Sequence, residues 1–158
     1  MEASFPPDER RTYEEQKALL NHPLYRIYVW TDVDKEISAF ITVWCFEAFT
    51  FVEHFAVNPK DRNLGIGAAM LGEIKTVLSG LICLEVELPD TEIARRRIGF
   101  YERNGFKMND YPYMQPAFST SKNPVPLRIM TSEKCILEDE FQEMKERLYL
   151  EVYHVSEV

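Results

Sequence analysis

The sequence predicts an α/β fold, an α+β mixed sheet covered by helices. The first observation is the order of hydrophobic patterns along the chain, which is helix, hairpin, strand, helix, strand, helix, two strands and helix. Strands joined through helices run parallel and hairpin strands run antiparallel, so this order requires a mixed sheet. The second observation is a strand, a glycine-containing turn and the start of a helix between Phe51 and Leu71. The third is size, because 158 residues, 46% of them hydrophobic, suit one domain over residues 1–158.

The first half of the chain is predicted to form two helices and three strands. The first helix follows Asp8 and runs to about Leu20, because His22-Pro23 ends it. Three strands and a helix follow, over residues 24–30, 36–46, 49–57 and about 66–78. A turn over residues 32–35 makes the first two strands a hairpin.

The second half is predicted to alternate strands with two helices. A strand, a helix and two short strands follow one another over residues 81–88, about 91–104, 106–109 and 127–131. The helix ends at Asn104-Gly105, where the glycine supplies a left-handed cap. The two short strands bracket a long loop rich in proline and aromatic residues. A last helix over about residues 137–152 carries one apolar stripe.

Charge and cysteine content exclude several classes of function. A net charge of −8 and a pI near 5.0 argue against a nucleic acid as the main partner, because binding to the phosphate backbone needs a basic face. The acidity would suit a cationic acceptor, and it equally serves solubility. Cys45, Cys83 and Cys135 lack the spacing of metal ligands, so we expect reduced thiols and no metal. The uncharged hydrophobic run over residues 37–46 is too short to cross a bilayer, and we expect a cytoplasmic protein without a membrane partner.

The turn before the second helix is the most informative stretch. Asn58-Pro59 ends a hydrophobic strand, and Gly65 and Gly67 then let the backbone turn tightly into the helix. Such a turn exposes N–H groups at a helix N-terminus, which suits an anion such as phosphate. A purely structural turn needs the same residues. A dinucleotide-binding turn would have a third glycine where this chain has Met70, which disfavours that alternative.

The motif Arg62-x-x-Gly65-x-Gly67, placed after a strand that ends at Val57, resembles the acetyl-coenzyme A pyrophosphate loop of the GNAT N-acetyltransferase superfamily. The resemblance extends from about Tyr25 to Thr131. It implies a GNAT-like acyl-CoA N-acyltransferase fold and acetyl-CoA as co-substrate. It also implies that the strands on either side of the loop and its helix splay apart to admit the cofactor.

The same resemblance implies a set of cofactor-binding residues. Backbone groups of two strand residues would pair with the pantetheine arm, and the loop would hold the pyrophosphate. The set comprises Phe55, Val57, Arg62, Asn63, Leu64, Gly65, Ile66, Gly67 and Ala68.

A second segment, from Phe100-Tyr101 to Gly105-Phe106, resembles the GNAT helix that runs beside the thiol end of the cofactor. By this resemblance Tyr101 is the general acid that protonates the leaving thiolate, although a helix tyrosine is also commonly a core residue. The helix departs from the family at its start, because Ala94 stands where many members have an asparagine.

Acetyl transfer to an amine requires a base, because an alkylammonium has a pKa of about 10.4 and is a poor nucleophile until it loses a proton. Glu53 is the candidate base, since it lies in mid-strand on the face that we expect Phe55 and Val57 to share. Burial would make its carboxylate a stronger base. It could equally pair with a cationic side chain or only attract the acceptor. We expect His54 to point away from this face.

Further residues are candidates for the acceptor and for the oxyanion. Glu85 and Glu87, near the end of the neighbouring strand, would bind a cationic acceptor, or they are edge charges. Tyr111 and Tyr113 lie in the predicted loop and would line the acceptor pocket, unless the loop packs on itself. The backbone N–H of Val57 would stabilise the tetrahedral oxyanion.

The family usually begins with a strand for which this chain has no counterpart, so we expect the first edge strand to be missing. A bare hairpin edge invites strand pairing, and we therefore expect a homo-oligomer or a partly truncated fold. The function expected from the whole pattern is acetyl transfer from acetyl-CoA to an amine of a small molecule or peptide by direct attack. The alternative is a catalytically weak acyl-CoA-binding regulatory or interaction module.

Overall fold

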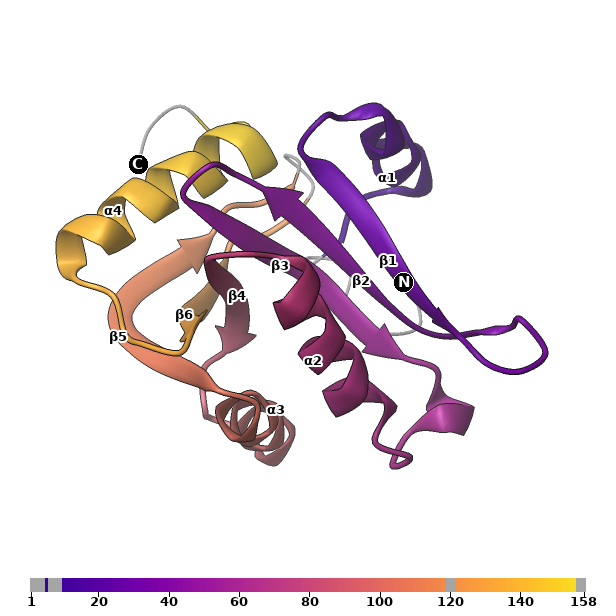
Figure 1. Cartoon of the computed structure of the whole chain (residues 1–158). Coiled ribbons are helices and arrows are strands. Elements are labelled where there is room, and N and C mark those ends of the chain that lie inside the picture. The colour runs from indigo at the N-terminus through magenta and orange to yellow at the C-terminus, as the bar shows by residue number, and fades with distance from the viewer. Residues whose placement is uncertain (1–4, 6–9, 119–121, 156–158) are drawn as a thin grey trace.

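The computed structural model describes residues 5, 10–118 and 122–155, and its centre is one six-stranded mixed sheet (Figure 1). The strand order is β1-β2-β3-β4-β6-β5. The strands are β1 (Tyr25–Thr31), β2 (Ile37–Cys45), β3 (Phe49–Val57), β4 (Leu81–Glu87), β5 (Phe106–Gln115) and β6 (Val125–Ser132). Only β3 and β4 pair in parallel, because the chain crosses between them through a helix. The predicted mixed sheet is confirmed.

Helices cover both faces of this sheet (Figure 1). The helices are α1 (Tyr13–Ala18), α2 (Ile66–Val77), α3 (Glu92–Arg103) and α4 (Glu138–Arg147), with short 3-10 turns at Leu19–Asn21 and Pro59–Asp61. A π-helical turn, Leu148–Val152, extends α4. The first helix starts later than expected, because Thr12 caps it in a capping box with Glu15. Asp8 lies outside the described residues.

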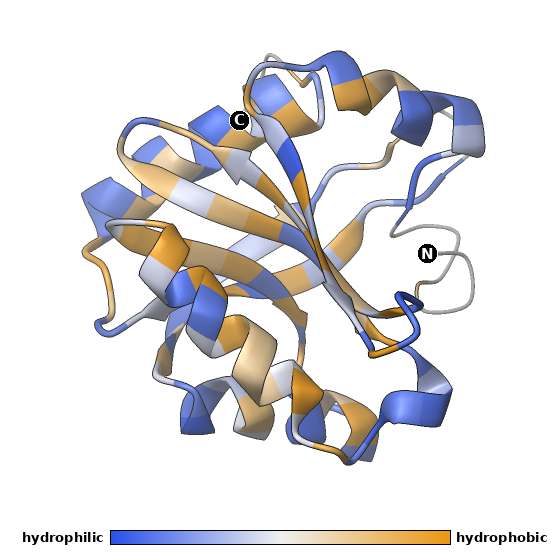
Figure 2. Ribbon diagram, turned by 45° about the vertical axis from the view of Figure 1, so that its right-hand side comes forward, coloured by the Kyte–Doolittle hydropathy of each residue, from blue (hydrophilic) through white to orange (hydrophobic). Residues whose placement is uncertain are grey.

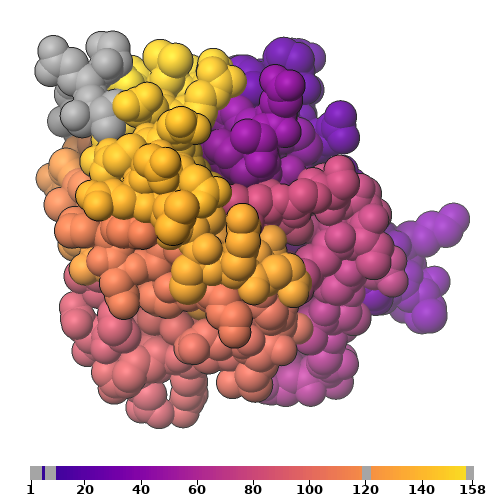
Figure 3. All heavy atoms as spheres, turned by 60° about the vertical axis from the view of Figure 1, so that its left-hand side comes forward, coloured from indigo at the N-terminus to yellow at the C-terminus, as the bar shows by residue number. Residues whose placement is uncertain are grey.

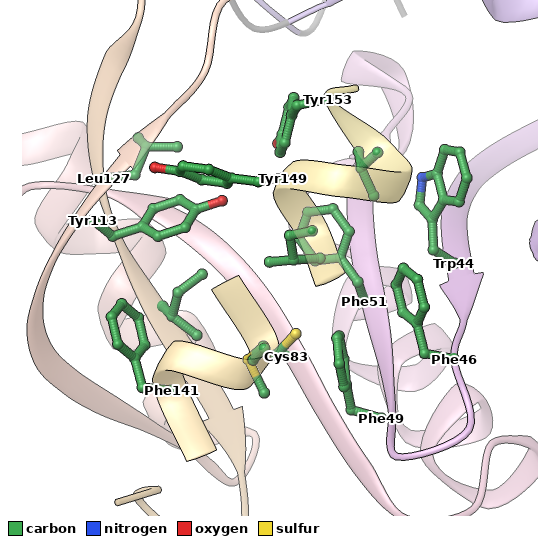
Figure 4. Close-up of a cluster of buried hydrophobic side chains, with 14 of the residues drawn as sticks. Trp44, Phe46, Phe49, Phe51, Cys83, Tyr113, Leu127, Phe141, Tyr149 and Tyr153 are labelled. Carbon is green, nitrogen blue, oxygen red and sulfur yellow. The ribbon is translucent and has the colours of Figure 1, made fainter. Parts of the chain in front are cut away.

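Two hydrophobic cores lie on opposite faces of the sheet. One, which we call the α2/α3 core, includes Met70, Ile74 and Ile98. The other, the α4 core, includes Phe141 and Leu148 (Figure 4). Apolar stripes of the helices turn inward in Figure 2, as their sequence periodicity predicts. In the space-filling view α4 (yellow) lies directly against the orange β5 part of the chain (Figure 3).

The parallel pair β3 and β4 separates along its length. Their register runs from Phe49 opposite Leu81 to Val52 opposite Leu84 and then stops. Both strands continue, β3 to Val57 and β4 to Glu87, without pairing to each other. The sheet therefore opens between their carboxyl ends, as the family resemblance implies.

A β-bulge at Glu53 corrects the predicted facing of β3. Thr42 pairs with His54 and Val43 pairs with Val52, so Glu53 has no partner on β2. An extra residue reverses the alternation of side chains. Glu53 consequently does not share a face with Phe55 and Val57, which pack against the α2/α3 core. His54 does not point away from Glu53 either, because its Nδ1 lies 3.9 Å from Glu53 Oε2.

Strand β5 is longer than expected, and this also corrects a prediction. Tyr111 and Tyr113 lie within β5 and not in a loop. Pro112 between them is tolerated because β5 is an edge strand and its pairing with β6 is interrupted between Asn109 and Tyr113.

The other edge of the sheet is β1. Within the described residues no strand pairs with its outer side. None of the described helices combines the length and the apolarity that a bilayer crossing needs.

Candidate active site

The loop that begins α2 presents a row of backbone donors. Asn63 and Gly65 have positive φ angles of 66° and 77°, which turn the chain sharply into the helix. Among the described residues no acceptor bonds the N–H groups from Asn63 to Ala68, and the next N–H, of Ala69, donates to the Gly65 carbonyl at 3.1 Å. A Cβ at Gly67 would lie 3.4 Å from the Phe100 ring, so this position packs closely against α3. The loop therefore has the donors of an anion site.

The backbone of β3 faces the opening at alternate residues. The N–H of His54 donates to Thr42 Oγ1 at 3.0 Å, and the N–H of Asn58 donates to the Ser38 carbonyl at 2.7 Å. Both acceptors, Thr42 and Ser38, belong to β2. Phe55 and Val57 alternate with these residues, so they direct their N–H and C=O groups toward β4 and the opening. The Val57 carbonyl also accepts the Arg62 Nε–H at 3.3 Å, which ties the loop to the strand end.

Tyr101 lies on the α2/α3 side of the opening. Its ring packs between Phe100 and Phe106, at centroid distances of 5.3 and 5.8 Å. Burial raises the pKa of its hydroxyl to about 12, and the nearby positive charge of Arg97 opposes this rise. The hydroxyl therefore stays protonated at physiological pH and can act as a donor.

Glu85 lies on the opposite, α4 side of the opening, one residue beyond the last parallel pair. Its carboxylate accepts hydrogen bonds from the hydroxyls of Tyr113 at 2.5 Å and Tyr153 at 2.7 Å, and from Gln115 Nε2 at 3.0 Å. Burial raises the pKa of Glu85 to about 7, and the negative charge of Glu53 adds to this rise, while the three hydrogen bonds oppose it. We call these four residues the Glu85 cluster. Figure 4 shows its two tyrosines, from β5 and from the end of the π-helical turn, at one end of the α4 core.

Gln115 contributes a second feature to this cluster. Its side-chain Oε1 is buried and has no hydrogen-bond partner within the described part of the chain. A buried acceptor without a donor is rare in folded proteins and indicates a place for a ligand or a water.

Glu53 lies on the same side as the Glu85 cluster, but its charge is already paired. Its Oε1 lies 2.5 Å from Arg11 Nη1 as a close ion pair whose angle is not that of a hydrogen bond. Its Oε2 accepts the Trp44 indole N–H at 3.0 Å. Trp44 and Arg11 therefore hold this carboxylate from two directions.

An open parallel pair, a donor-rich helix start and a titratable acid thus surround one opening in the sheet. Residues 23–108 match the sequence profile of the acetyltransferase (GNAT) domain, which is more than half of the chain. The chain belongs to the GNAT acetyltransferase family. No sequence among the curated proteins is significantly similar to this chain.

Solved structures agree with this membership. A GNAT-family acetyltransferase from Bacteroides thetaiotaomicron is 35% identical, with a TM-score of 0.90 over 97% of this chain and 87% of that chain. The ribosomal-protein-S18-alanine N-acetyltransferase of Escherichia coli is 19% identical, with a TM-score of 0.58 over 86% of this chain and 83% of that chain. A spermidine N-acetyltransferase chimera of Vibrio cholerae is 14% identical, with a TM-score of 0.57 over 82% and 79%. The last two show the fold alone.

As a GNAT acetyltransferase the protein is an enzyme whose family uses acetyl-CoA as donor. The structure does not bring all predicted acceptor residues of this GNAT enzyme together. Glu85 and Tyr113 meet at 2.5 Å. Glu87 instead pairs with Arg97 at the surface, at 2.8 Å. The Tyr111 hydroxyl donates to the Ile136 carbonyl at 2.9 Å, which places it in a structural role.

Sequence reasoning missed Tyr153 and Arg11, which lie in this GNAT site. Tyr153 follows the predicted apolar stripe of the last helix by one residue, as the buried Tyr149 does, so their spacing offered a signal for a second inward row. Arg11 offered none, because nothing in the pattern around it distinguishes a buried arginine from a solvated one. Its partner Glu53 was predicted, but their pairing depends on the bulge in β3, which the sequence does not show.

Proposed function

We propose that this GNAT enzyme transfers an acetyl group from acetyl-CoA to an amine of a small molecule or peptide by direct attack. The observation that supports it most is the opening between β3 and β4, with backbone donors on one side and the Glu85 cluster on the other. A thioester held in this opening would be accessible to an amine from the α4 side.

The proposed donor site uses the residues that the family resemblance names. The N–H groups from Asn63 to Ala68 would hold the diphosphate of acetyl-CoA, and the Arg62 guanidinium would stay beside it. Backbone groups of Phe55 and Val57 would pair with the pantetheine amides as an added strand does. These groups have the required directions and, in the loop, no competing acceptor among the described residues.

The contacts favour Glu85 over Glu53 as the base. Arg11 already balances the charge of Glu53, whereas Glu85 is held only by neutral donors. Its pKa of about 7 lies where a general base is most effective near neutral pH. The ammonium would give a proton to Glu85, and the amine nitrogen would then form a bond to the thioester carbon. The free Oε1 of Gln115 would accept a hydrogen bond from the amine N–H and orient its lone pair. The second N–H proton would pass to solvent as the tetrahedral intermediate collapses.

Collapse of the tetrahedral intermediate breaks the carbon–sulfur bond, and the thiolate leaves. Tyr101, protonated because burial raises its pKa to about 12, would donate a hydrogen bond or its proton to that sulfur. The Val57 N–H, directed into the opening, would stabilise the oxyanion. Acid and base thus act from opposite faces of the sheet.

The acceptor class rests on charge and on likeness. Structures of this fold include enzymes named for a ribosomal-protein alanine and for spermidine, both of which present amines. In this chain the Glu85 carboxylate lies beside the Gln115 Oε1, a hydrogen-bond acceptor without a donor among the described residues, and this pair would suit an amine as well. The thiols of Cys45, Cys83 and Cys135 are free, which supports the proposed cytoplasmic location.

Release of the coenzyme A thiol, measured over a panel of monoamines, polyamines, amino acids and peptides, tests this proposal. We expect Glu85→Gln to lower kcat by roughly a hundredfold to ten-thousandfold and to remove a rise in rate through about pH 7. The same change at Glu87, a surface carboxylate two residues along β4, should leave the rate within about twofold. Binding of acetyl-CoA without thiol release from any acceptor would favour the alternative, a catalytically weak acyl-CoA-binding module.

A further inference from the structure

A buried guanidinium occupies the acceptor side of the opening. The side chains of Arg11 and Glu53 are only 7% and 2% exposed, and their charged atoms lie 2.5 Å apart. Arg11 Nη2 also donates to the Val152 carbonyl, at 3.2 Å, at the end of the π-helical turn. The guanidinium lies 4.6 Å from the Phe118 ring centroid and 5.8 Å from that of Trp44. These contacts place one carboxylate, one carbonyl and two aromatic rings around the guanidinium, and we call them the Arg11 cage.

The cage sets the charge that an acceptor meets. Glu53 is near enough to Glu85 for its negative charge to act on that carboxyl. Without Arg11, two carboxylates would therefore face the acceptor from β3 and β4. With Arg11 in place, Glu53 and the guanidinium cancel, and Glu85 supplies the remaining negative charge of this group.

We propose that Arg11 is a specificity-determining residue, which restricts the acceptor site to amines that carry a single positive charge. This inference rests on the proposed acetyl transfer. The first ammonium of an acceptor is matched by Glu85. A second ammonium on the same molecule would find the Glu53 carboxylate already held by the guanidinium, so it would lose its water there without gaining a counter-charge.

Burial makes this discrimination strong. An ammonium that enters a site with little water needs a counter-charge there, and the Arg11–Glu53 pair as a whole offers none, so an added cation beside it is disfavoured. Removal of Arg11 reverses the situation, because it leaves the Glu53 carboxylate buried without a counter-charge. A dicationic acceptor would then supply the missing charge and bind better than a monocationic one.

Two acceptors that differ only in a terminal ammonium, hexylamine and hexamethylenediamine, test the proposal. The measured quantity is the ratio of kcat/KM for the diamine to kcat/KM for the monoamine. The statistical advantage of two amino groups is the same for every variant, so it cancels when ratios are compared. We expect Arg11→Gln to raise this ratio roughly tenfold or more over the wild type.

Two further variants separate charge from structural damage. Glu53→Gln leaves the guanidinium uncompensated, so it should lower the ratio below that of the wild type. The double variant Arg11→Gln with Glu53→Gln has no charge at either position, and its ratio should return to within about twofold of the wild type. A structural defect would lower both rates together and leave the ratio unchanged.

The proposal is overturned if Arg11→Gln changes kcat/KM for both amines by the same factor, because the guanidinium would then have only a structural role. It is also overturned if Glu53→Gln leaves the ratio unchanged or raises it, and this variant decides the matter should Arg11→Gln fail to fold. Calorimetric binding of both amines to the coenzyme A complex gives the same ratio without turnover. A charge preference in binding with no acetyl transfer would refute the proposed function and retain the role of Arg11.

Discussion

Glu85 holds a carboxyl group in a place where ionisation is costly. Burial raises its pKa from the ordinary 4.5 to about 7, so the folded protein keeps this proton at pH values where the unfolded chain has lost it. The folded state therefore binds more protons than the unfolded state between these two values. Stability must fall as pH rises through this range and become level above it.

We predict that the contribution of Glu85 to the free energy of unfolding falls by about 3 kcal/mol between about pH 4.5 and pH 7.5, since each unit by which the pKa is raised corresponds to about 1.4 kcal/mol. Glu85→Gln should lack this component, so the difference between the two proteins should grow in favour of the variant with increasing pH. Urea unfolding over this range measures it. Parallel pH profiles of the two proteins would show that Glu85 titrates normally.

At the same scale, the sequence predicts residue types better than it predicts their directions. Glu85 and Tyr113 were expected at the acceptor site and do meet there. Glu53 was expected beside Phe55, and the bulge overturned this because one unpaired residue reverses every side chain after it. A bulge depends on how β2 and β3 pair, and the sequence of β3 alone does not contain that information.

At the scale of elements, the turn into α2 combines two demands on Gly65. The residue has a φ of 77°, and a Cβ placed on it would have nothing within 4 Å, so a side chain there is strained but not crowded. It also stands in the middle of the free N–H groups. Gly80, with a φ of 83° and equally open surroundings, has the same backbone strain at the opposite end of α2.

We predict that Gly65→Asp weakens acetyl-CoA binding by roughly tenfold or more, because it places a carboxylate among donors that would hold a diphosphate. Gly80→Asp is the matched control, since it adds the same charge and a similar strain far from the loop. Its dissociation constant should equal that of the wild type, while both variants lose roughly 1–2 kcal/mol of stability. Equal affinities for the two variants, measured by calorimetry, would remove the loop from the donor site.

Elements were predicted well where periodicity was long, as in α2, α3 and α4. Strand β5 was predicted too short, because Pro112 is a strand breaker in a central strand and is harmless at an edge. Whether a strand lies at an edge is a property of the sheet, which explains why Tyr111 and Tyr113 were assigned to a loop.

In the whole molecule, the sheet divides the proposed donor groups from the proposed acceptor groups, which lie on opposite faces. The α2/α3 face would hold the donor and Tyr101, and the α4 face holds the Glu85 cluster and the Arg11–Glu53 pair. The opening between β3 and β4 connects the two faces. The family resemblance predicted this opening, whereas the periodicity of the strands did not. The homo-oligomer expected from the bare edge of β1 stays a prediction, which sedimentation equilibrium would test.

A crystal structure with bound acetyl-CoA would show whether the opening between β3 and β4 holds the thioester. We predict the diphosphate at hydrogen-bond distance, about 2.7–3.2 Å, from N–H groups between Asn63 and Ala68. The thioester should lie in the opening beyond Val52 and Leu84, with Tyr101 on one side and Glu85 on the other. A diphosphate bound elsewhere would show that this loop is not the donor site. Pairing of β3 with β4 along their whole length, with no ligand between them, would rule out the opening as the place of acetyl transfer.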